Sequence, residues 1–367
     1  MTTNMNFKNF ETNLNLWLTP YWETATPGLC LEVYHRGQKI FDYQGGEFYP
    51  YYDLSSLTKV LFTVPAMIMA MQKGFWNFDT KVKDILAWWP HPQTKIIELL
   101  SHTSGLLWWK AFYKDLETAP EISKRWEILK EDIIVSPINI QINSIYSDLG
   151  FMTLAYLIQE LWQQPLHSIW DLVKTEFAPQ STLHWIVSGK KNGTDLLAPT
   201  TSLFPRTHYA PTEICPWRKR RLQGEVHDEN AWILGGLSTH AGLFGNPGDV
   251  ASVFLKLRSI ALDQTHSAHH ILRSFMQRQI EKERGDWALG FMMPTLGASS
   301  SGNYFSNNSI GHTGFTGTSV WWDVDADVLV VLLTNRVYYG REQRGIAKLR
   351  PLLHDKIIEQ LIKEDIK

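Results

Sequence analysis

The sequence lacks several features that would each place it in a distinct class of protein. Its 367 residues include only two cysteines, Cys30 and Cys215, which have no metal-ligand spacing and supply no disulfide framework. No apolar stretch reaches the ~18 residues that a membrane-spanning helix requires. The net charge is only −2, so neither nucleic acid nor an anionic membrane is an evident partner. These absences leave a small molecule or a peptide as the expected partner, with the oligomeric state open.

The N-terminal residues also lack the marks of a secretory signal, because residues 1–8 hold no basic segment followed by an apolar run. We therefore expect a cytoplasmic protein. The composition that is present is ordinary for a globular chain, with 44% hydrophobic and 20% charged residues. A chain of this length can bury a substantial core, and we expect two structural units.

Strand-like runs occur near both ends of the chain, whereas helical patterns fill the middle. The strand-like runs are residues 29–35, 39–43, 319–323 and 328–334, and the helical runs are residues 56–73, 95–100, 149–162 and 344–362. Pro65 predicts a kink in the first of these helices. Residues 188–221 are rich in Gly, Pro, Thr and Lys and predict an extended surface excursion. This order predicts a sheet-containing α/β domain from residues 1–75 and 265–367, a helical inserted domain from residues 76–264, and an active cleft between them.

A serine and a lysine at the start of the helix over residues 56–73 are the first candidate catalytic residues. Ser56 and Lys59 are three residues apart and so share a helix face. A serine hydroxyl is a weak nucleophile until a base takes its proton, and a desolvated lysine can act as that base. The helix N-terminus adds backbone N–H groups where an oxyanion would form. Taken alone, however, an S-x-x-K pattern is more often a helix start with a solvated lysine.

Two later motifs supply partners for this pattern. A Y-S-D motif at residues 146–148 follows Ser56 by 90 residues, and an H-T-G motif at residues 312–314 follows it by 256 residues. The order S-x-x-K, Y-x-[ND], [KH]-T-G resembles the serine β-lactamase and penicillin-binding-protein superfamily, on the side of class C β-lactamases, D,D-peptidases, muramyl amidases and related esterases. Further agreeing segments are residues 53–59 (DLSSLTK), 99–106 (LLSHTSGL), 224–231 (GEVHDENA), 235–245, 312–318 (HTGFTGT) and 333–336 (LTNR).

The resemblance implies a β-lactamase/transpeptidase-like α/β (α+β) fold, in which an antiparallel sheet is flanked by helices and a mostly helical domain is inserted. It implies neither a cofactor nor a metal. It also assigns catalytic roles to three residues. Ser56 would attack a carbonyl group and become acylated, while Lys59 and Tyr146 would share the proton taken from Ser56 and return it to the leaving group.

The same resemblance implies the residues that surround the substrate. The backbone N–H groups of Ser56 and Phe315 would form the oxyanion hole. His312 and Thr313 would face a substrate carboxylate or another acceptor. Gly314 would let the substrate backbone approach the strand closely.

Two positions depart from the pattern of many β-lactamases and bear on the substrate. Asp148 stands where many members have asparagine, and an ionised aspartate cannot donate the amide hydrogen bond that holds a penicillin side chain. We expect Asp148 to pair with Lys59, to hold the lysine charged, and to shift the role of base toward Tyr146. His312 replaces a lysine and would be only partly charged at neutral pH, which gives a weaker and pH-sensitive clamp. Both changes favour an amidase, peptidase or esterase over an efficient β-lactamase.

Several polar residues near these motifs have a structural alternative. Asp148 could serve as the N-cap of the following helix, alone or in addition to its role at the site. His102, Ser104 and His240 are interpreted as structural residues. The run of His227, Asp228 and a glutamate lacks a second ligand pair for a metal, and we interpret it as a loop in the cleft wall in which His227 or Asp228 touches substrate.

The sequence therefore predicts a serine hydrolase that forms an acyl-enzyme on an amide or an ester. A peptide or muropeptide derived from the cell wall is the leading substrate. A carboxylesterase or a weak β-lactamase of the same fold is one alternative. A non-catalytic protein that binds a peptide as a sensor is another, for which the departure at Asp148 leaves room.

Overall fold

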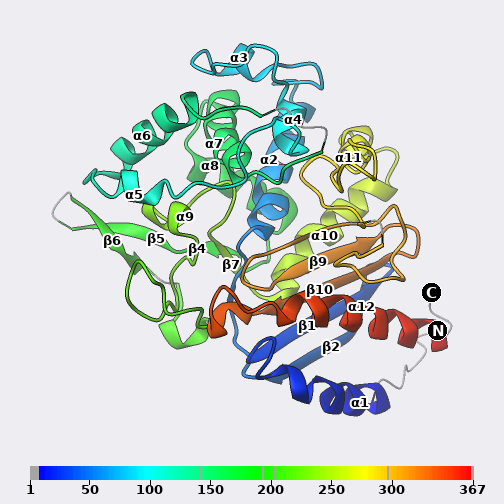
Figure 1. Cartoon of the computed structure of the whole chain (residues 1–367). Coiled ribbons are helices and arrows are strands. Elements are labelled where there is room, and N and C mark those ends of the chain that lie inside the picture. Colours follow the sequence, from blue (N-terminus) through cyan, green and yellow to red (C-terminus); the bar gives the residue numbers. More distant parts are fainter. Residues whose placement is uncertain (1–7, 140–142, 192–193, 202, 296, 365–367) are drawn as a thin grey trace.

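The computed structural model describes residues 8–364 except 140–142, 192–193, 202 and 296. A five-stranded sheet in the order β2-β1-β10-β9-β8 crosses the lower half of Figure 1, and all its neighbouring strands are antiparallel. Its strands are β1 (Gly28–His35), β2 (Gln38–Gly46), β8 (Ile310–Thr313), β9 (Ser319–Asp323) and β10 (Val328–Thr334). Because β1 pairs with β10, segments from both ends of the sequence form one sheet, which confirms the predicted fold class.

The hairpin of β1 and β2 closes through two residues with left-handed backbone. Arg36 has φ 50° and Gly37 has φ 80°, as a two-residue hairpin turn of the favoured hand requires. The predicted strands and the turn between them are thus confirmed.

Both faces of the sheet are covered by helices, and the side chains of the central strands alternate between them. Val328, Val330 and Leu332 of β10 pack in one core with α1 (Lys8–Leu18) and α12 (Gly345–Lys363). The intervening residues 329, 331 and 333 belong to the larger core, which includes α10 (Pro247–Leu262). Since every residue of β10 is buried, the strand reads as a continuous apolar run.

The helical part of the chain occupies the upper half of Figure 1. Its helices are η2 (Lys59–Thr63), α2 (Val64–Gln72), α3 (Val82–Ile85), α4 (Ile96–Leu100), α5 (Tyr113–Leu116), α6 (Ile122–Ile134), α7 (Asp148–Trp162), α8 (Leu166–Phe177), α9 (Glu229–Ile233) and α11 (His269–Phe275). Short strands β3 (Tyr52–Asp53), β7 (Leu243–Gly245) and β4 (His184–Trp185) form a second sheet, and β5 (Val187–Lys191) pairs with β6 (Thr194–Thr201). The helix α2 packs against α7, α8 and α11 and so lies at the centre of this part.

A π-helical turn interrupts the helix predicted over residues 56–73. In η2 the N–H group of Val64 bonds back to the carbonyl of Lys59, and Pro65 follows at the start of α2. Proline has no N–H group for the ordinary helical bond, and a widened turn accommodates its absence. The irregular turn therefore begins at Lys59, one of the candidate catalytic residues.

Other predictions met mixed outcomes. The helices predicted at residues 95–100, 149–162 and 344–362 are present as α4, α7 and α12, whereas α1 was not predicted. The predicted surface excursion at 188–221 is wrong for its later part, because Tyr209, Glu213 and Cys215 are buried. The division into domains stays a prediction, and α10 packs on the sheet although it lies within residues 76–264.

Candidate active site

Lys59, from the same helical turn as Ser56, and Tyr146, from a distant part of the sequence, meet at the Oγ atom of Ser56. Ser56 is half-buried and directly precedes the helical run that leads into η2. Its Oγ accepts a hydrogen bond from Lys59 Nζ at 3.1 Å and another from Tyr146 Oη at 2.8 Å. The structure thus brings together the three residues to which the sequence assigns catalytic roles.

Lys59 is fully buried, and three acceptors surround its Nζ. Besides Ser56 Oγ they are Asp148 Oδ1 at 2.7 Å and the carbonyl of His240 at 2.9 Å. Burial lowers the pKa of the amine by withdrawing its charge from water, and the Asp148 carboxylate acts in the opposite direction. Burial prevails, so the pKa of Lys59 lies below its ordinary value even though the predicted ion pair with Asp148 is present.

Tyr146 is half-buried among aromatic rings and holds its proton. Its ring stacks on Trp287 with centroids 5.4 Å apart and lies 4.7 Å from the ring of His102. Burial raises the pKa of Tyr146 well above its usual value, and the nearby charge of Asp148 adds to this rise. The two pKa values thus shift in directions that disfavour the predicted transfer of the role of base from Lys59 to Tyr146, and the identity of the base stays a prediction.

Asp148 begins α7 but does not cap it. The cap is Ser147, whose Oγ accepts from the N–H group of Gly150 at 3.1 Å. The side chain of Asp148 is left to bind Lys59, and its own N–H group donates to the carbonyl of Trp108 at 2.9 Å. The interpretation of Asp148 as the N-cap is wrong by one residue.

His312, near the end of β8, is neutral rather than partly charged. Its ring is buried, and Nδ1 lies 2.8 Å from the carbonyl of Thr313. Burial, with a smaller contribution from the charge of Lys59, lowers the pKa of His312 to about 3. The expectation of a partly charged clamp is therefore wrong for the free protein, whereas the half-buried Thr313 ends β8 opposite Ser319.

Because Gly314 has no side chain, the segment that precedes Ser56 packs closely against it. This close contact does not leave open space for a substrate at that position. A Cβ atom at this position would lie 2.1 Å from Thr318 Oγ1, 2.8 Å from the carbonyl of Leu54 and 3.3 Å from the Cβ of Ser55. The position predicted to admit the substrate backbone is thus filled by the protein's own atoms. Glycine here lets the turn after β8 pack against Leu54 and Ser55, which precede the candidate nucleophile.

Phe315 joins the same turn to a second cluster of residues. Its N–H group, predicted to belong to the oxyanion hole, donates to Ser55 Oγ at 3.2 Å. Phe315 is 43% exposed, and its ring stacks on His227 with centroids 5.5 Å apart and lies 4.5 Å from the guanidinium carbon of Arg336. The ring is therefore held in place while one part of it remains open to solvent.

His227 and Asp228 make contacts within the protein. The N–H group of His227 donates to Asp53 Oδ2 at 2.7 Å. Asp228 caps α9 through the N–H group of Ala231, and its Oδ1 lies 3.0 Å from Nε2 of His240. Because the carbonyl of His240 accepts from Lys59, Asp228 supports the site through this histidine. Contact of His227 or Asp228 with substrate stays a prediction.

Sequence reasoning did not single out the role of Asp53. This buried carboxylate accepts from the N–H groups of Ser55 at 2.8 Å and of His227 at 2.7 Å, and burial raises its pKa. It thus ties the nucleophile segment to the loop before α9. The available signal was its place three residues before Ser56 in the motif at residues 53–59.

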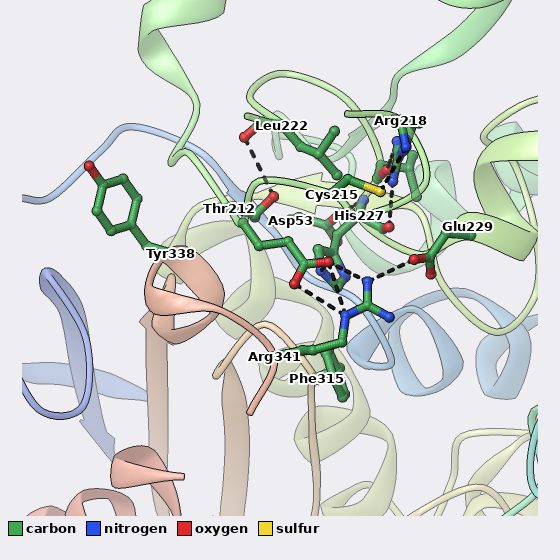
Figure 2. A network of polar contacts seen from close by, with 12 residues as sticks. Asp53, Thr212, Cys215, Arg218, Leu222, His227, Glu229, Phe315, Tyr338 and Arg341 are labelled. Carbon is green, nitrogen blue, oxygen red and sulfur yellow. Dashed lines mark hydrogen bonds and ion pairs between the residues drawn. The ribbon is translucent and has the colours of Figure 1, made fainter. Parts of the chain in front are cut away.

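A buried polar network lies next to Phe315, which is drawn below Arg341 in Figure 2. One potential metal-ligand atom from each of Glu213, Cys215 and Glu229 lies within 4.8 Å of the other two, which is close enough for the three to bind one metal ion. However, the guanidinium group of Arg341 binds both carboxylates, as Figure 2 shows. This contact and that of His227 help to lower the pKa of Glu213 to about 2, against burial, which alone would raise it. A resident arginine thus balances the charge that would attract a cation.

The chain matches known proteins over most of its length. A family model described as Beta-lactamase matches residues 14–354. The chain belongs to the Beta-lactamase family. Over 311 residues it is 27% identical to an N-acetylmuramyl-L-alanine amidase of Bacillus subtilis, which covers 78% of this chain and 68% of the relative. Over 308 residues it is 27% identical to a putative D-alanyl-D-alanine carboxypeptidase of Escherichia coli, with 78% and 69% covered.

Two solved structures share the fold of this chain. A class C β-lactamase from Rhodobacter sphaeroides superposes with a TM-score of 0.64 at 17% identity, covering 92% of this chain and 97% of that one. EstCE1, a hydrolase with promiscuous acyltransferase activity, gives 0.64 at 15% identity, with 93% and 97% covered. The protein is thus a hydrolase with the fold of serine β-lactamases and penicillin-binding proteins. Among its described residues, no helix combines the length and apolarity needed to cross a bilayer.

Proposed function

We propose that this β-lactamase-family protein is an amidase or peptidase that cleaves a cell-wall-derived peptide or muropeptide through an acyl-enzyme on Ser56. The observation that carries the proposal is the convergence of Lys59 Nζ and Tyr146 Oη on Ser56 Oγ. The named activities of its amidase and carboxypeptidase relatives support the choice of substrate class.

Lys59 is the proposed base. Burial lowers the pKa of its amine, so this amine loses its proton more easily than an ordinary lysine does. Neutral Lys59 accepts the Ser56 proton across 3.1 Å as Oγ attacks the carbonyl carbon. The remaining hydrogen bonds of Nζ, to Asp148 and to the carbonyl of His240, keep the amine in position.

Tyr146 is the proposed general acid. Its raised pKa keeps the phenol protonated until the tetrahedral intermediate collapses. The phenol then gives its proton to the leaving nitrogen, and the proton held by Lys59 restores it, so that acylation consumes no external proton. Water next attacks the acyl-enzyme, and the same two residues return a proton to Ser56 as the acid is released.

Asp148 argues against an efficient β-lactamase. Its Oδ1 is occupied by Lys59, and a carboxylate has no N–H group to offer a penicillin side chain. The neutral His312 likewise supplies no full positive charge for the β-lactam carboxylate. Recognition of the substrate therefore rests on groups other than a fixed cation at the end of β8.

Covalent labelling tests the role of Ser56. The protein is incubated with a fluorophosphonate and analysed by intact mass and peptide mapping, with Ser56→Ala as the test variant. Ser259→Ala, which removes an exposed serine on α10, is the matched control. We expect one label on Ser56 in the parent and in the control, and none in Ser56→Ala. Equal labelling of all three proteins would refute the assignment.

A substrate panel then separates the remaining alternatives. Rates are compared for a muramyl-L-alanyl peptide, a D-alanyl-D-alanine peptide, a short p-nitrophenyl ester and a chromogenic cephalosporin. We expect the highest kcat/KM with one of the two wall-derived substrates. A dominant ester rate would make the protein a carboxylesterase, and binding of muropeptide without turnover or acylation would make it a sensor.

A further inference from the structure

Ser55, the residue before the candidate nucleophile, has an unusual backbone. Its φ of 50° lies in the left-handed region, which costs energy for a residue with a Cβ atom. Three hydrogen bonds hold it there: its N–H group donates to Asp53 Oδ1, and its carbonyl accepts from both the N–H group and Oγ1 of Thr58. A strained conformation fixed this firmly beside a reactive residue points to a function of the side chain.

The Ser55 hydroxyl lies at the predicted oxyanion hole. Its Oγ is 3.2 Å from the N–H group of Phe315, which donates to it, and Ser55 is only 5% exposed. Gly314 makes this approach possible, because a Cβ atom there would lie 3.3 Å from the Cβ of Ser55. The N–H group of Ser56, the other predicted donor, has no acceptor among the residues that the structure describes.

A hydroxyl group offers one proton as well as two lone pairs. Ser55 Oγ accepts from Phe315, but within the described part of the chain no hydrogen bond takes its own proton. The O–H group of this buried side chain is therefore an available hydrogen-bond donor. This hydroxyl lies beside the N–H group of Phe315, one of the two donors of the predicted oxyanion hole.

We propose that Ser55 is a third donor of the oxyanion hole. In the free enzyme its Oγ accepts from the Phe315 N–H group and so satisfies this buried donor. When the acyl group binds, the carbonyl oxygen takes over that N–H group together with the one of Ser56. The Ser55 hydroxyl then turns and donates its proton to the same oxygen as charge develops there. The hydroxyl keeps its proton throughout, so no bond to Ser55 forms or breaks.

This inference rests on the proposed role of Ser56 as nucleophile, and its test uses the variants Ser55→Ala and Ser55→Gly. Both remove the hydroxyl, and glycine also relieves the left-handed strain. Thr318→Val is the matched control, because Thr318 Oγ1 supports the same segment through the carbonyl of Leu54 at 3.2 Å without contacting the Phe315 N–H group. Thermal unfolding shows that each variant is folded.

The readouts are the rate of labelling by a fluorophosphonate, whose phosphoryl oxygen occupies the oxyanion hole, and kcat and KM for an acyl ester. We expect Ser55→Ala and Ser55→Gly to lower the labelling rate and kcat by about 10- to 100-fold with little change in KM, as loss of an oxyanion donor does. Thr318→Val should change neither by more than about threefold.

Each contrary outcome has its own meaning. Unchanged or faster labelling of the Ser55 variants would overturn the donor role, because the hydroxyl would then only fill the hole until substrate displaces it. An equal loss in Thr318→Val would also overturn it, since the effect would come from the segment's position. Labelling that persists in Ser56→Ala would instead refute the proposed function.

Discussion

The side chains of Lys59 and Asp148 form an ion pair with 2.7 Å between Nζ and Oδ1, in which the lysine is fully buried and the aspartate is 14% exposed. The pair combines two opposing influences on one amine. Burial lowers the pKa of Lys59 and the carboxylate raises it, with burial the larger. The charge state of the proposed base is thus set by a balance that a single substitution can move.

Asp148→Asn is expected to move the acid limb of the pH profile to lower pH. Acylation requires neutral Lys59, so kcat/KM rises with pH through the pKa of the amine. Removal of the carboxylate leaves the lowering by burial opposed only by the smaller influence of Asp228, and the limb should shift down by about one pH unit or more. The measurement is kcat/KM for an uncharged ester between pH 5 and 10. A limb that stays in place, or moves upward, would contradict Lys59 as the base.

Tyr146→Phe is expected to lower kcat by about 10²- to 10³-fold, as loss of a general acid does. The ring contacts with Trp287 and His102 persist, so the fold and KM should change little. Tyr156→Phe is the control, because it removes another tyrosine hydroxyl of a half-buried side chain, which lies in α7 and donates to the carbonyl of Trp126. Equal losses in the two variants would show that the hydroxyl of Tyr146 serves stability and not proton transfer.

His312→Gln is expected to leave the shape of the pH profile between pH 5.5 and 8 unchanged. The pKa of His312 is lowered to about 3, so the imidazole is neutral throughout this interval and contributes no step. Steady-state rates with a substrate that bears a carboxylate give the strictest test. A step near pH 6.5 in the parent that disappears in the variant would restore the charged clamp that the sequence suggested.

Buried histidines should also make stability fall with acid. Burial, aided by the charge of Arg350, lowers the pKa of His354 to about 3, whereas an unfolded histidine binds a proton below pH ~6.5. Between these values the unfolded state alone takes up the proton, so the free energy of unfolding decreases by about 1.4 kcal/mol per pH unit for this group. Stability from this source is fully present above pH ~6.5 and is lost as the pH falls.

His354→Leu should remove that contribution from the slope. Urea unfolding of the parent and the variant at pH 6, 5 and 4 measures it. We expect the variant's curve to be shallower by about 1.4 kcal/mol per pH unit, whatever its stability at neutral pH. Parallel curves would show that His354 binds its proton equally well in both states.

The sequence by itself determined the local features of this protein, namely the spacing of neighbouring site residues and most of its helices and strands. Ser56 and Lys59 meet because three residues along a helical turn bring side chains to one face, which needs no tertiary information. Four strands of the central sheet were predicted from their apolar runs, and the turn at Arg36 and Gly37 from its glycine, whereas β8 was not predicted because its four residues include His312 and Thr313. The helix α1 was not predicted because most of its residues are polar and its apolar stripe is narrow. Leu14 and Leu18 are the buried members of that stripe.

Only the tertiary structure decided the pKa values of the site residues and which atoms pack around them. Tyr146 and the carbonyl of His240 reach Lys59 from 87 and 181 residues away, and their packing removes the water that would keep the amine protonated. Desolvation therefore lowers the pKa of Lys59 and that of His312, against the charged states that the sequence suggested for both. The same packing set the Ser55 hydroxyl against the N–H group of Phe315. A sequence pattern records which groups are present, but their pKa values and free protons depend on burial and on neighbours that only the fold supplies.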